Sequence, residues 1–96
     1  KTPSPIYFFE KGGMVNFTRF AASVLGPFGI RVNALHPGGF LNRQPEAFIK
    51  NYCANTMLGR LANDSDLKGA VVFLASGASG YLTGANIPVD GGYTAK

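Results

Sequence analysis

The chain has 96 residues, of which 46% are hydrophobic and 15% are charged, and its net charge is +4. This balance excludes a disordered, charge-driven chain and leaves room for one small domain. The nine basic residues are scattered along the chain, which argues against nucleic-acid binding because such a surface needs basic residues gathered on one face.

The first predicted element is a helix over Tyr7–Leu25, which follows an extended stretch holding two prolines. Residues recur along it at helical spacing and give the helix an apolar face, which consists of Met14, Phe17, Thr18, Ala21, Val24 and Leu25. Gly12-Gly13 interrupts this pattern at a cost of about 1 kcal/mol per glycine relative to alanine. The two glycines therefore indicate either a very close neighbour at that point or a helix that begins later. Gly26-Pro27 ends the helix.

The next predicted elements are a short strand and a short helix. Ile30–Leu35 is expected to be a strand, because it holds β-branched residues and is bounded by glycine and proline. Pro45-Glu46 suits a helix start, with a proline near the first helical position and an acid in the first turn. The apolar stripe of this helix consists of Phe48, Ile49, Tyr52 and Cys53.

A third helix is predicted to run to Ala75, with Asp64 or Ser65 as its N-cap, and a second strand covers Asn86–Val89. The order helix, strand, helix, helix, strand is typical of an α/β fold in which a helical crossover joins parallel strands. Two strands alone do not form a stable sheet. We therefore expect the C-terminal half of a Rossmann-like, doubly wound parallel sheet rather than a complete domain.

Two residues with possible catalytic chemistry, Tyr7 and Lys11, share one face of the first predicted helix. An ammonium beside a phenol favours the phenolate and lowers the pKa of the tyrosine from about 10 toward the range of a general acid or base. The same lysine could hold ribose hydroxyls. An ordinary surface lysine beside a half-buried tyrosine has the same spacing, so the pair alone does not decide between these interpretations.

The second motif is His36-Pro37-Gly38-Gly39, which ends the first predicted strand. In open α/β sheets, ligands bind at the carboxyl ends of strands, and glycine lets the backbone approach a ligand closely. His36 is the single histidine of the chain. Since the sequence pairs it with no acid or second histidine, we expect a loop residue rather than a base or metal ligand, and no metal site.

Together, the ordered segments resemble the short-chain dehydrogenase/reductase family over nearly the whole chain. Tyr7-x-x-x-Lys11 is similar to the catalytic pair of that family. The other matching segments, which resemble its signature strand, cofactor loop, last helix, turn and last strand, are Gly29–Ala34, Pro37-Gly38, Phe73–Ser76, Thr83-Gly84 and Val89–Gly92.

The resemblance implies an oxidoreductase that uses NAD or NADP to transfer hydride to or from an alcohol or carbonyl substrate. Tyr7 would exchange a proton with the substrate oxygen, and Lys11 would lower the pKa of Tyr7 and bind the nicotinamide ribose. Residues 41–57 match the variable substrate loop and would form a lid. The residues implied to contact the cofactor are Tyr7, Lys11, Pro37, Gly38, Gly39, Phe40 and Asn42.

The sequence also departs from the family pattern. Residues 1–96 lack the dinucleotide-binding strand, turn and helix and the catalytic serine that the family places upstream of the tyrosine, and Ser4 is too near Tyr7 to replace that serine. Glu10 stands where a small residue is usual, and Asn42 stands where threonine often contacts the cofactor. We therefore expect residues 1–96 to be the C-terminal catalytic and substrate-binding half of the domain, inactive by itself.

The alternative function is a truncated, non-catalytic module that acts only in subunit association. Either a homo-oligomer (dimer or tetramer) or the missing N-terminal half would cover apolar side chains, namely Phe17, Phe20, Phe73, Tyr81 and Tyr93. The single cysteine fits a cytoplasmic location. No apolar run approaches the ~18–20 residues of a membrane span, and the first five residues lack the apolar core of a signal peptide, so no membrane partner is expected.

Overall fold

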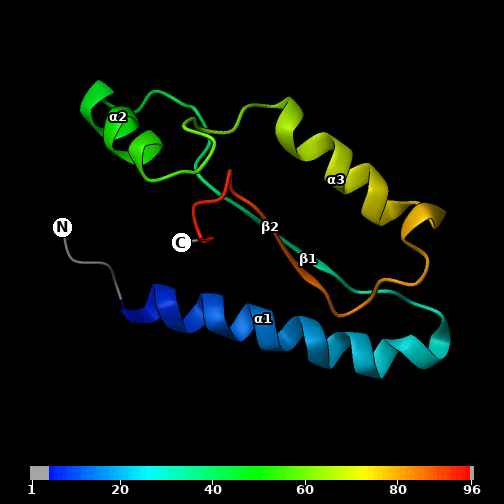
Figure 1. The fold of residues 1–96 in the computed structure, drawn as a ribbon. Coiled ribbons are helices and arrows are strands. Elements are labelled where there is room, and N and C mark those ends of the chain that lie inside the picture. Colours follow the sequence, from blue (N-terminus) through cyan, green and yellow to red (C-terminus); the bar gives the residue numbers. More distant parts are fainter. Residues whose placement is uncertain (1–4, 96) are drawn as a thin grey trace. The chain divides into compact units, whose positions relative to one another are not determined.

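The computed structural model describes residues 5–95, except for the side chain of Tyr7 (Figure 1). Its helices and strands are, in chain order, α1 (Pro5–Leu25), the 3-10 helix η1 (Gly26–Phe28), β1 (Ala34–Pro37), α2 (Glu46–Ala54), α3 (Ser65–Ala75), the 3-10 helix η2 (Gly77–Ser79) and β2 (Asn86–Val89). The predicted order of helices and strands is confirmed. The chain divides into two compact units, Lys1–Ala34 with Gly80–Asn86 and Leu35–Ser79 with Ile87–Lys96.

The two strands are hydrogen-bonded neighbours and run parallel. The Ala34 amide donates to the Ala85 carbonyl at 2.9 Å, and the Gly38 amide donates to the Val89 carbonyl at 3.0 Å. Both partners advance by four residues in the same direction, which defines a parallel register. The α/β class is therefore confirmed.

The first strand begins later than the predicted Ile30, because before Ala34 one backbone bond, from the Gly84 amide to the Val32 carbonyl at 2.7 Å, is accompanied by side-chain bonds instead of a continued ladder. The Val32 amide donates to the Thr83 hydroxyl at 3.0 Å. The Asn33 side chain donates to the Leu82 carbonyl at 2.9 Å and accepts from the Ala85 amide at 3.0 Å. The segment is held firmly beside its neighbour, but not by the repeating backbone bonds that define a strand.

Helix α1 differs from its prediction in two ways. It runs without a break through Gly12 and Gly13, and a Cβ at either glycine would meet nothing within 4 Å. Both interpretations of this pair, a late helix start and a close neighbour, are therefore wrong for the described chain. The buried side chains of α1 are the small Thr18 and Ala22, at 4% and 7% exposure, whereas Phe17 is 59% exposed.

The small face of α1 packs against the segment that leads into β2. A Cβ at Gly84 would lie 3.5 Å from the Ala22 Cβ, and Gly84 has a φ of +73° that favours glycine. The Asn86 side chain donates to the Val15 carbonyl at 3.4 Å. Small residues on both sides thus allow α1 and this segment to approach closely within the first unit.

Helix α3 is capped by a residue that the sequence analysis did not select. Asp64 stands at the N-cap position without a side-chain cap bond. Instead, the Asn63 side chain accepts bonds from the Ser65 amide at 3.1 Å and the Ser65 hydroxyl at 2.7 Å, while Asp66 accepts from the Asn63 amide at 2.8 Å. This reciprocal arrangement resembles a capping box that begins one residue earlier.

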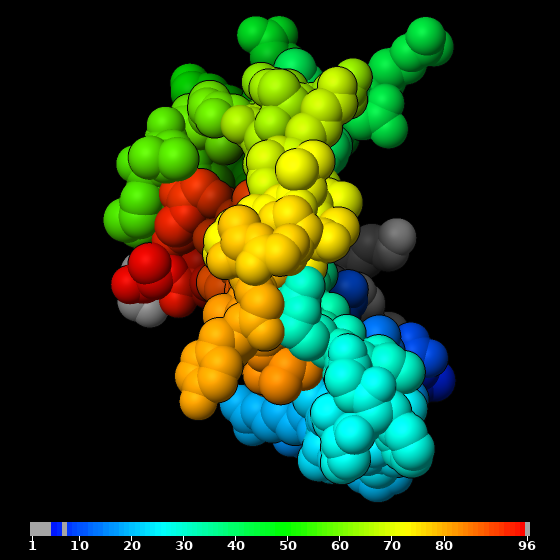
Figure 2. All heavy atoms as spheres, turned by 90° about the vertical axis from the view of Figure 1, so that its right-hand side faces the viewer, coloured from blue at the N-terminus to red at the C-terminus, as the bar shows by residue number. Residues whose placement is uncertain are grey.

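The buried core of the described residues is small. Its buried apolar side chains are Ala22 and Leu61, while many large apolar side chains are exposed, among them Phe9, Phe20, Phe28, Val72 and Tyr81. Figure 2 shows the segment near residue 80 in orange, and this segment includes Tyr81, which is fully exposed. Among the described residues, no helix combines the length and the apolar character needed to cross a membrane.

Candidate functional site

The segment Pro37–Asn42, named the cofactor loop after the role expected from the sequence, leaves β1 at the carboxyl end of the strand. Pro37 is exposed, Gly38–Phe40 are half-buried and Asn42 is exposed again. The structure thus brings these five predicted contact residues together in one short loop of the second unit. Their position is the one where open α/β sheets bind ligands.

Hydrogen bonds hold this loop from several sides. The Gly38 amide donates to the Val89 carbonyl, and the Gly39 amide donates to the Tyr52 hydroxyl at 2.7 Å. The Gly39 carbonyl in turn accepts a bond from the Ala62 amide at 2.8 Å. Because the amides of Gly38 and Gly39 already donate within the chain, a bound ligand would not use them as donors.

Phe40 and Ala62 form an isolated parallel bridge. The bridge consists of the bond to the Gly39 carbonyl and a bond from the Leu41 amide to the Ala62 carbonyl at 2.8 Å. In such a bridge, the residue between the two bonded neighbours, which is Phe40 here, directs its own amide away from its partner. The Phe40 amide is therefore directed away from Ala62, while the Phe40 carbonyl accepts a 2.7 Å bond from the Gln44 side chain.

Both glycines of the loop are required by close neighbours. A Cβ at Gly38 would lie 2.8 Å from the Asp90 Cα, which is backbone. A Cβ at Gly39 would lie 2.7 Å from the Tyr52 ring and 2.9 Å from the end of Leu61. These distances are below van der Waals contact, so the loop keeps this path only while both positions lack a side chain.

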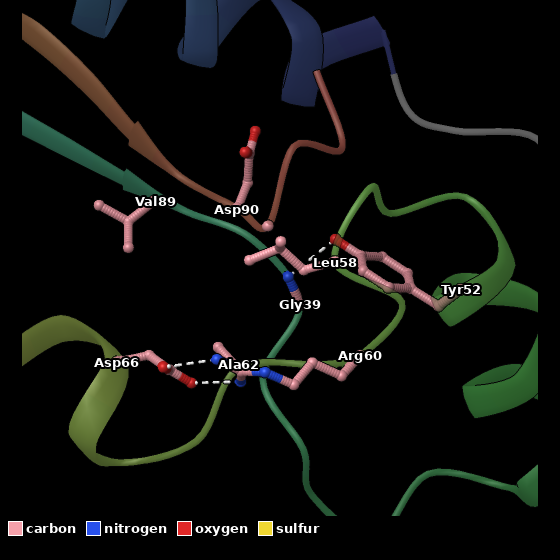
Figure 3. A pocket seen from close by; sticks show the side chains of 9 residues that line it. Gly39, Tyr52, Leu58, Arg60, Ala62, Asp66, Val89 and Asp90 are labelled. Carbon is pink, nitrogen blue, oxygen red and sulfur yellow. Dashed lines mark hydrogen bonds and ion pairs between the residues drawn. The ribbon is translucent and has the colours of Figure 1, made fainter. Parts of the chain in front are cut away.

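Beside the loop, a cavity of about 100 Å³ lies among residues from the ends of both strands and the α2–α3 connection (Figure 3). Its lining residues include Gly39, Tyr52, Arg60, Asp66 and Asp90. Figure 3 shows the Tyr52 hydroxyl directed at Gly39 and the Arg60 guanidinium paired with Asp66.

The Arg60–Asp66 ion pair forms part of this cavity wall. Two guanidinium nitrogens donate to the two carboxylate oxygens, at 2.7 and 2.9 Å. These bonds, together with the bond from the Asn63 amide, lower the pKa of Asp66 to about 2, and the same pairing raises the pKa of Arg60. The pair remains ionised at neutral pH and ties the connection between α2 and α3 to the first turn of α3.

Asp90 organises the turn that follows β2. Its carboxylate accepts bonds from the Thr94 hydroxyl at 2.6 Å, the Thr94 amide at 3.3 Å and the Gly92 amide at 3.0 Å. The bond from the Thr94 hydroxyl is the main cause that lowers the pKa of this carboxyl. The turn is thereby held beside Gly38, with which Asp90 is in close contact.

The predicted catalytic pair lies on α1, in the first unit. Tyr7 and Lys11 are separated by about one turn of this uninterrupted helix, and the Lys11 side chain is exposed. The Tyr7 side chain is outside the described residues, so its proposed role remains a prediction. Tyr7 and Lys11 therefore lie on one helix, whereas the five predicted loop contacts lie on a different segment of the chain.

The sequence also drew attention to Asn42 and His36, and the structure describes both residues. The Asn42 amide donates to the Gln44 side chain at 2.7 Å, which shapes the exposed part of the loop. The prediction of His36 as a loop residue is wrong, because β1 continues to Pro37 and contains His36, which is half-buried. Within residues 5–95, no cluster of three or more histidine, cysteine, aspartate or glutamate side chains could hold a metal ion.

Sequence reasoning missed the roles of Tyr52, Arg60 and Asp66. Tyr52 was predicted only as part of an apolar stripe, yet its hydroxyl bonds the loop. A signal was present, because a half-buried tyrosine usually finds a polar partner where a phenylalanine would not need one. The partner itself could not be read from the sequence.

Comparisons with known proteins match nearly the whole chain to one protein family. A sequence model for a family described as enoyl-(acyl carrier protein) reductase matches residues 2–94. The trans-4-hydroxycyclohexanecarboxylate dehydrogenase of Sinomonas cyclohexanicum is 39% identical over 89 residues, which cover 93% of this chain and 34% of that protein. The galactitol 2-dehydrogenase (L-tagatose-forming) of Cereibacter sphaeroides is 39% identical over 95 residues, covering 92% of this chain and 37% of that protein.

Solved structures agree with these relatives. The crystal structure of a short chain dehydrogenase from Leptospira borgpetersenii with bound NAD+ superposes with a TM-score of 0.90 at 47% identity, covering 94% of this chain and 35% of that chain. A short-chain type dehydrogenase/reductase from Mycobacterium marinum gives a TM-score of 0.84 at 35% identity, covering 94% and 37%. The chain therefore spans about a third of the length of the proteins that it matches.

Proposed function

The chain belongs to the short-chain dehydrogenase/reductase family, and we propose that it is the catalytic and substrate-binding half of an NAD(P)-dependent oxidoreductase acting on an alcohol or carbonyl. The named relatives are dehydrogenases, and one solved neighbour carries NAD+. Since the chain spans about a third of their length, the dinucleotide-binding half and the catalytic serine are proposed to lie outside residues 1–96.

One observation carries the catalytic part of the proposal: Tyr7 and Lys11 lie one turn apart on a single unbroken helix. The Tyr7 hydroxyl would exchange a proton with the substrate oxygen. The Lys11 ammonium would stabilise the phenolate by its charge and hold the ribose hydroxyls of the cofactor. The cofactor, when bound, supplies the hydride chemistry.

Two properties of the cofactor loop support contact with a nicotinamide: its partial exposure and the direction of its Phe40 amide. Pro37 offers an exposed apolar surface at the carboxyl end of β1, and the Phe40 amide is directed away from Ala62. Gly38 and Gly39 would contribute close approach rather than hydrogen bonds, because their amides donate within the chain. Asn42 would complete the contact from the exposed end of the loop, and residues 41–57 would form the lid.

The experiment that tests this proposal is Tyr7→Phe in the complete polypeptide, meaning the chain that joins residues 1–96 to the proposed dinucleotide-binding half. Loss of a general acid or base lowers turnover by about 10²–10⁴-fold. We expect this loss in kcat, with an affinity for NADH or NADPH within about twofold of the parent. Tyr81→Phe, which removes a hydroxyl from a fully exposed tyrosine, is the matched control. Near-normal turnover of Tyr7→Phe would remove Tyr7 from the mechanism.

Exposed apolar side chains support subunit association as a second candidate function. Phe17, Phe20 and Phe73 are 59%, 62% and 44% exposed, and Tyr81 is fully exposed. Tyr93 was predicted to belong to this set, but it does not, because it is half-buried and stacks on Tyr52 with ring centroids 4.8 Å apart.

A homodimer or homotetramer, or the dinucleotide-binding half, would cover these faces. The coding frame upstream of residue 1 discriminates the two functions. A glycine-rich strand, turn and helix there supports the enzyme, whereas their absence favours a module that only associates. A cytoplasmic location, without a nucleic-acid or membrane partner, is part of the enzyme proposal.

A further inference from the structure

Tyr52 connects α2 to the cofactor loop. Its hydroxyl oxygen accepts the hydrogen bond of the Gly39 amide at 2.7 Å, across 13 residues of sequence (Figure 3). The neighbouring bonds of Gly38 and of the Gly39 carbonyl are made by backbone groups. The Gly39 amide therefore depends on a side chain for its partner, and that side chain comes from the proposed lid.

The position of the Tyr52 ring is determined by its own neighbours. It stacks on Tyr93 at 4.8 Å with an interplanar angle of 22° and lies 6.0 Å from the Phe48 ring at 28°. The ring also lies so close to Gly39 that a Cβ at that residue would have no room. A ring held in this way brings its hydroxyl to the loop at a small cost in side-chain entropy.

We propose that Tyr52 is a positioning residue for cofactor binding: it holds the Gly39 amide and thereby restricts the backbone at Gly39, on which the direction of the adjoining Phe40 amide depends. The residue does not contact the cofactor itself. The Tyr52 bond holds the Gly38–Gly39 peptide unit, and the Ala62 bond holds the next unit, which carries the Gly39 carbonyl and the Phe40 amide, so the backbone is anchored on both sides of the Gly39 Cα. This inference rests on the proposed function, because it assigns the loop to the nicotinamide.

Tyr52→Phe in the complete polypeptide tests the inference, since it keeps the ring and its stacking but leaves the Gly39 amide without its acceptor. An amide that loses its acceptor in the folded protein destabilises the loop conformation that depends on that bond. We expect the dissociation constant for NADH or NADPH, measured by fluorescence titration at 25 °C, to rise about tenfold. We expect kcat at saturating cofactor to stay within about twofold. Tyr81→Phe again serves as the control, with both quantities unchanged.

A merely structural role would give a different result. In that case, Tyr52→Phe would lower the melting temperature but leave cofactor affinity at 25 °C unchanged, which would overturn the proposal. Amide hydrogen exchange gives a readout that does not depend on activity: exchange at Gly39 should accelerate about tenfold in Tyr52→Phe. Unchanged exchange at Gly39 would equally overturn it.

A second variant approaches the same contact from the loop side. Gly39→Ala places a Cβ against the Tyr52 ring and should also weaken cofactor binding by about tenfold or more. If Tyr52→Phe does not fold, normal affinity of Gly39→Ala overturns the inference by itself. If the parent polypeptide binds neither NADH nor NADPH, the proposed function fails and this inference fails with it. If the parent binds and Tyr52→Phe binds equally well, only the inference fails.

Discussion

Asp66 illustrates how one side chain can hold several segments at the residue scale. Its two carboxylate oxygens accept bonds from the Arg60 guanidinium and from the Asn63 amide. All of these bonds favour the charged carboxylate, and together they lower its pKa from the ordinary 3.8 to about 2. The start of α3 and the loop before it are therefore joined by an acceptor that must stay ionised.

This arrangement predicts a pH-dependent contribution to stability. Because the pKa of Asp66 is lower in the folded state than in the unfolded state, the contribution is fully present above about pH 4 and is lost as the pH falls toward 2. We expect Asp66→Asn to lower the melting temperature of the complete polypeptide slightly at pH 7. The difference from the parent should shrink and vanish near pH 2, and it should also shrink in 1 M salt.

Thermal unfolding followed by circular dichroism between pH 7 and pH 2 checks this prediction. Asp64→Asn is the control for removing a negative charge from the same turn, since Asp64 makes no side-chain cap bond. A difference between Asp66→Asn and the parent that stays constant over the whole pH range would contradict the assigned role.

At the element scale, the end of β1 is determined by close backbone packing. Gly38 donates its amide to the last residue of β2, and the position of its missing Cβ lies 2.8 Å from the Asp90 Cα. Asp90 cannot move easily, because its carboxylate is bonded to Gly92 and Thr94. The two strand ends therefore approach each other only because one residue has no side chain.

This packing predicts opposite effects for two glycine-to-alanine changes in the complete polypeptide. Gly38→Ala should lower the free energy of unfolding by about 1–3 kcal/mol, the usual cost of overpacking. Gly69→Ala in the interior of α3, where a Cβ would meet nothing within 4 Å, should raise it by about 0.5–1 kcal/mol. Chemical denaturation measures both, and a Gly38→Ala variant as stable as the parent would show that the strand ends are not closely packed.

For the whole molecule, the described residues bury too little apolar surface to stabilise a domain. Their buried apolar side chains are Ala22 and Leu61, and the sheet has two strands. Ordering the backbone costs about 1–2 kcal/mol per residue, whereas burial of one large apolar side chain returns about 1.5–3 kcal/mol. Phe9 is 81% exposed and Phe20 is 62% exposed. Much of the stabilisation from apolar burial therefore requires a partner outside the described residues.

We therefore expect the isolated segment of residues 1–96 to self-associate or to unfold without a sharp transition. Sedimentation at two concentrations and circular dichroism melts would show this. The isolated segment should also bind NADH and NADPH more weakly than micromolar, because the proposed pyrophosphate-binding turn lies outside it. A monodisperse monomer with a cooperative transition, or micromolar cofactor affinity, would show that this half is a domain in its own right.

The sequence by itself determined the order of the elements, the parallel α/β class and the family. It could do so because these depend on local signals: apolar periodicity, glycine and proline at the ends of elements, and ordered motifs along one chain. The break at Gly26-Pro27 and the helix start at Pro45-Glu46 were predicted in this way and are confirmed. The spacing of Tyr7 and Lys11 on one helix was equally readable.

The tertiary structure decided which local options are realised. Of the predicted apolar face of α1, it buries Thr18 and leaves Phe17 exposed. It holds the segment before Ala34 largely by side-chain bonds instead of a strand ladder, and it brings the Tyr52 hydroxyl to Gly39. The partners in the last two contacts are 13 to about 50 residues apart in sequence. No local pattern encodes such contacts, because they depend on where the chain returns and on how much space a neighbour leaves.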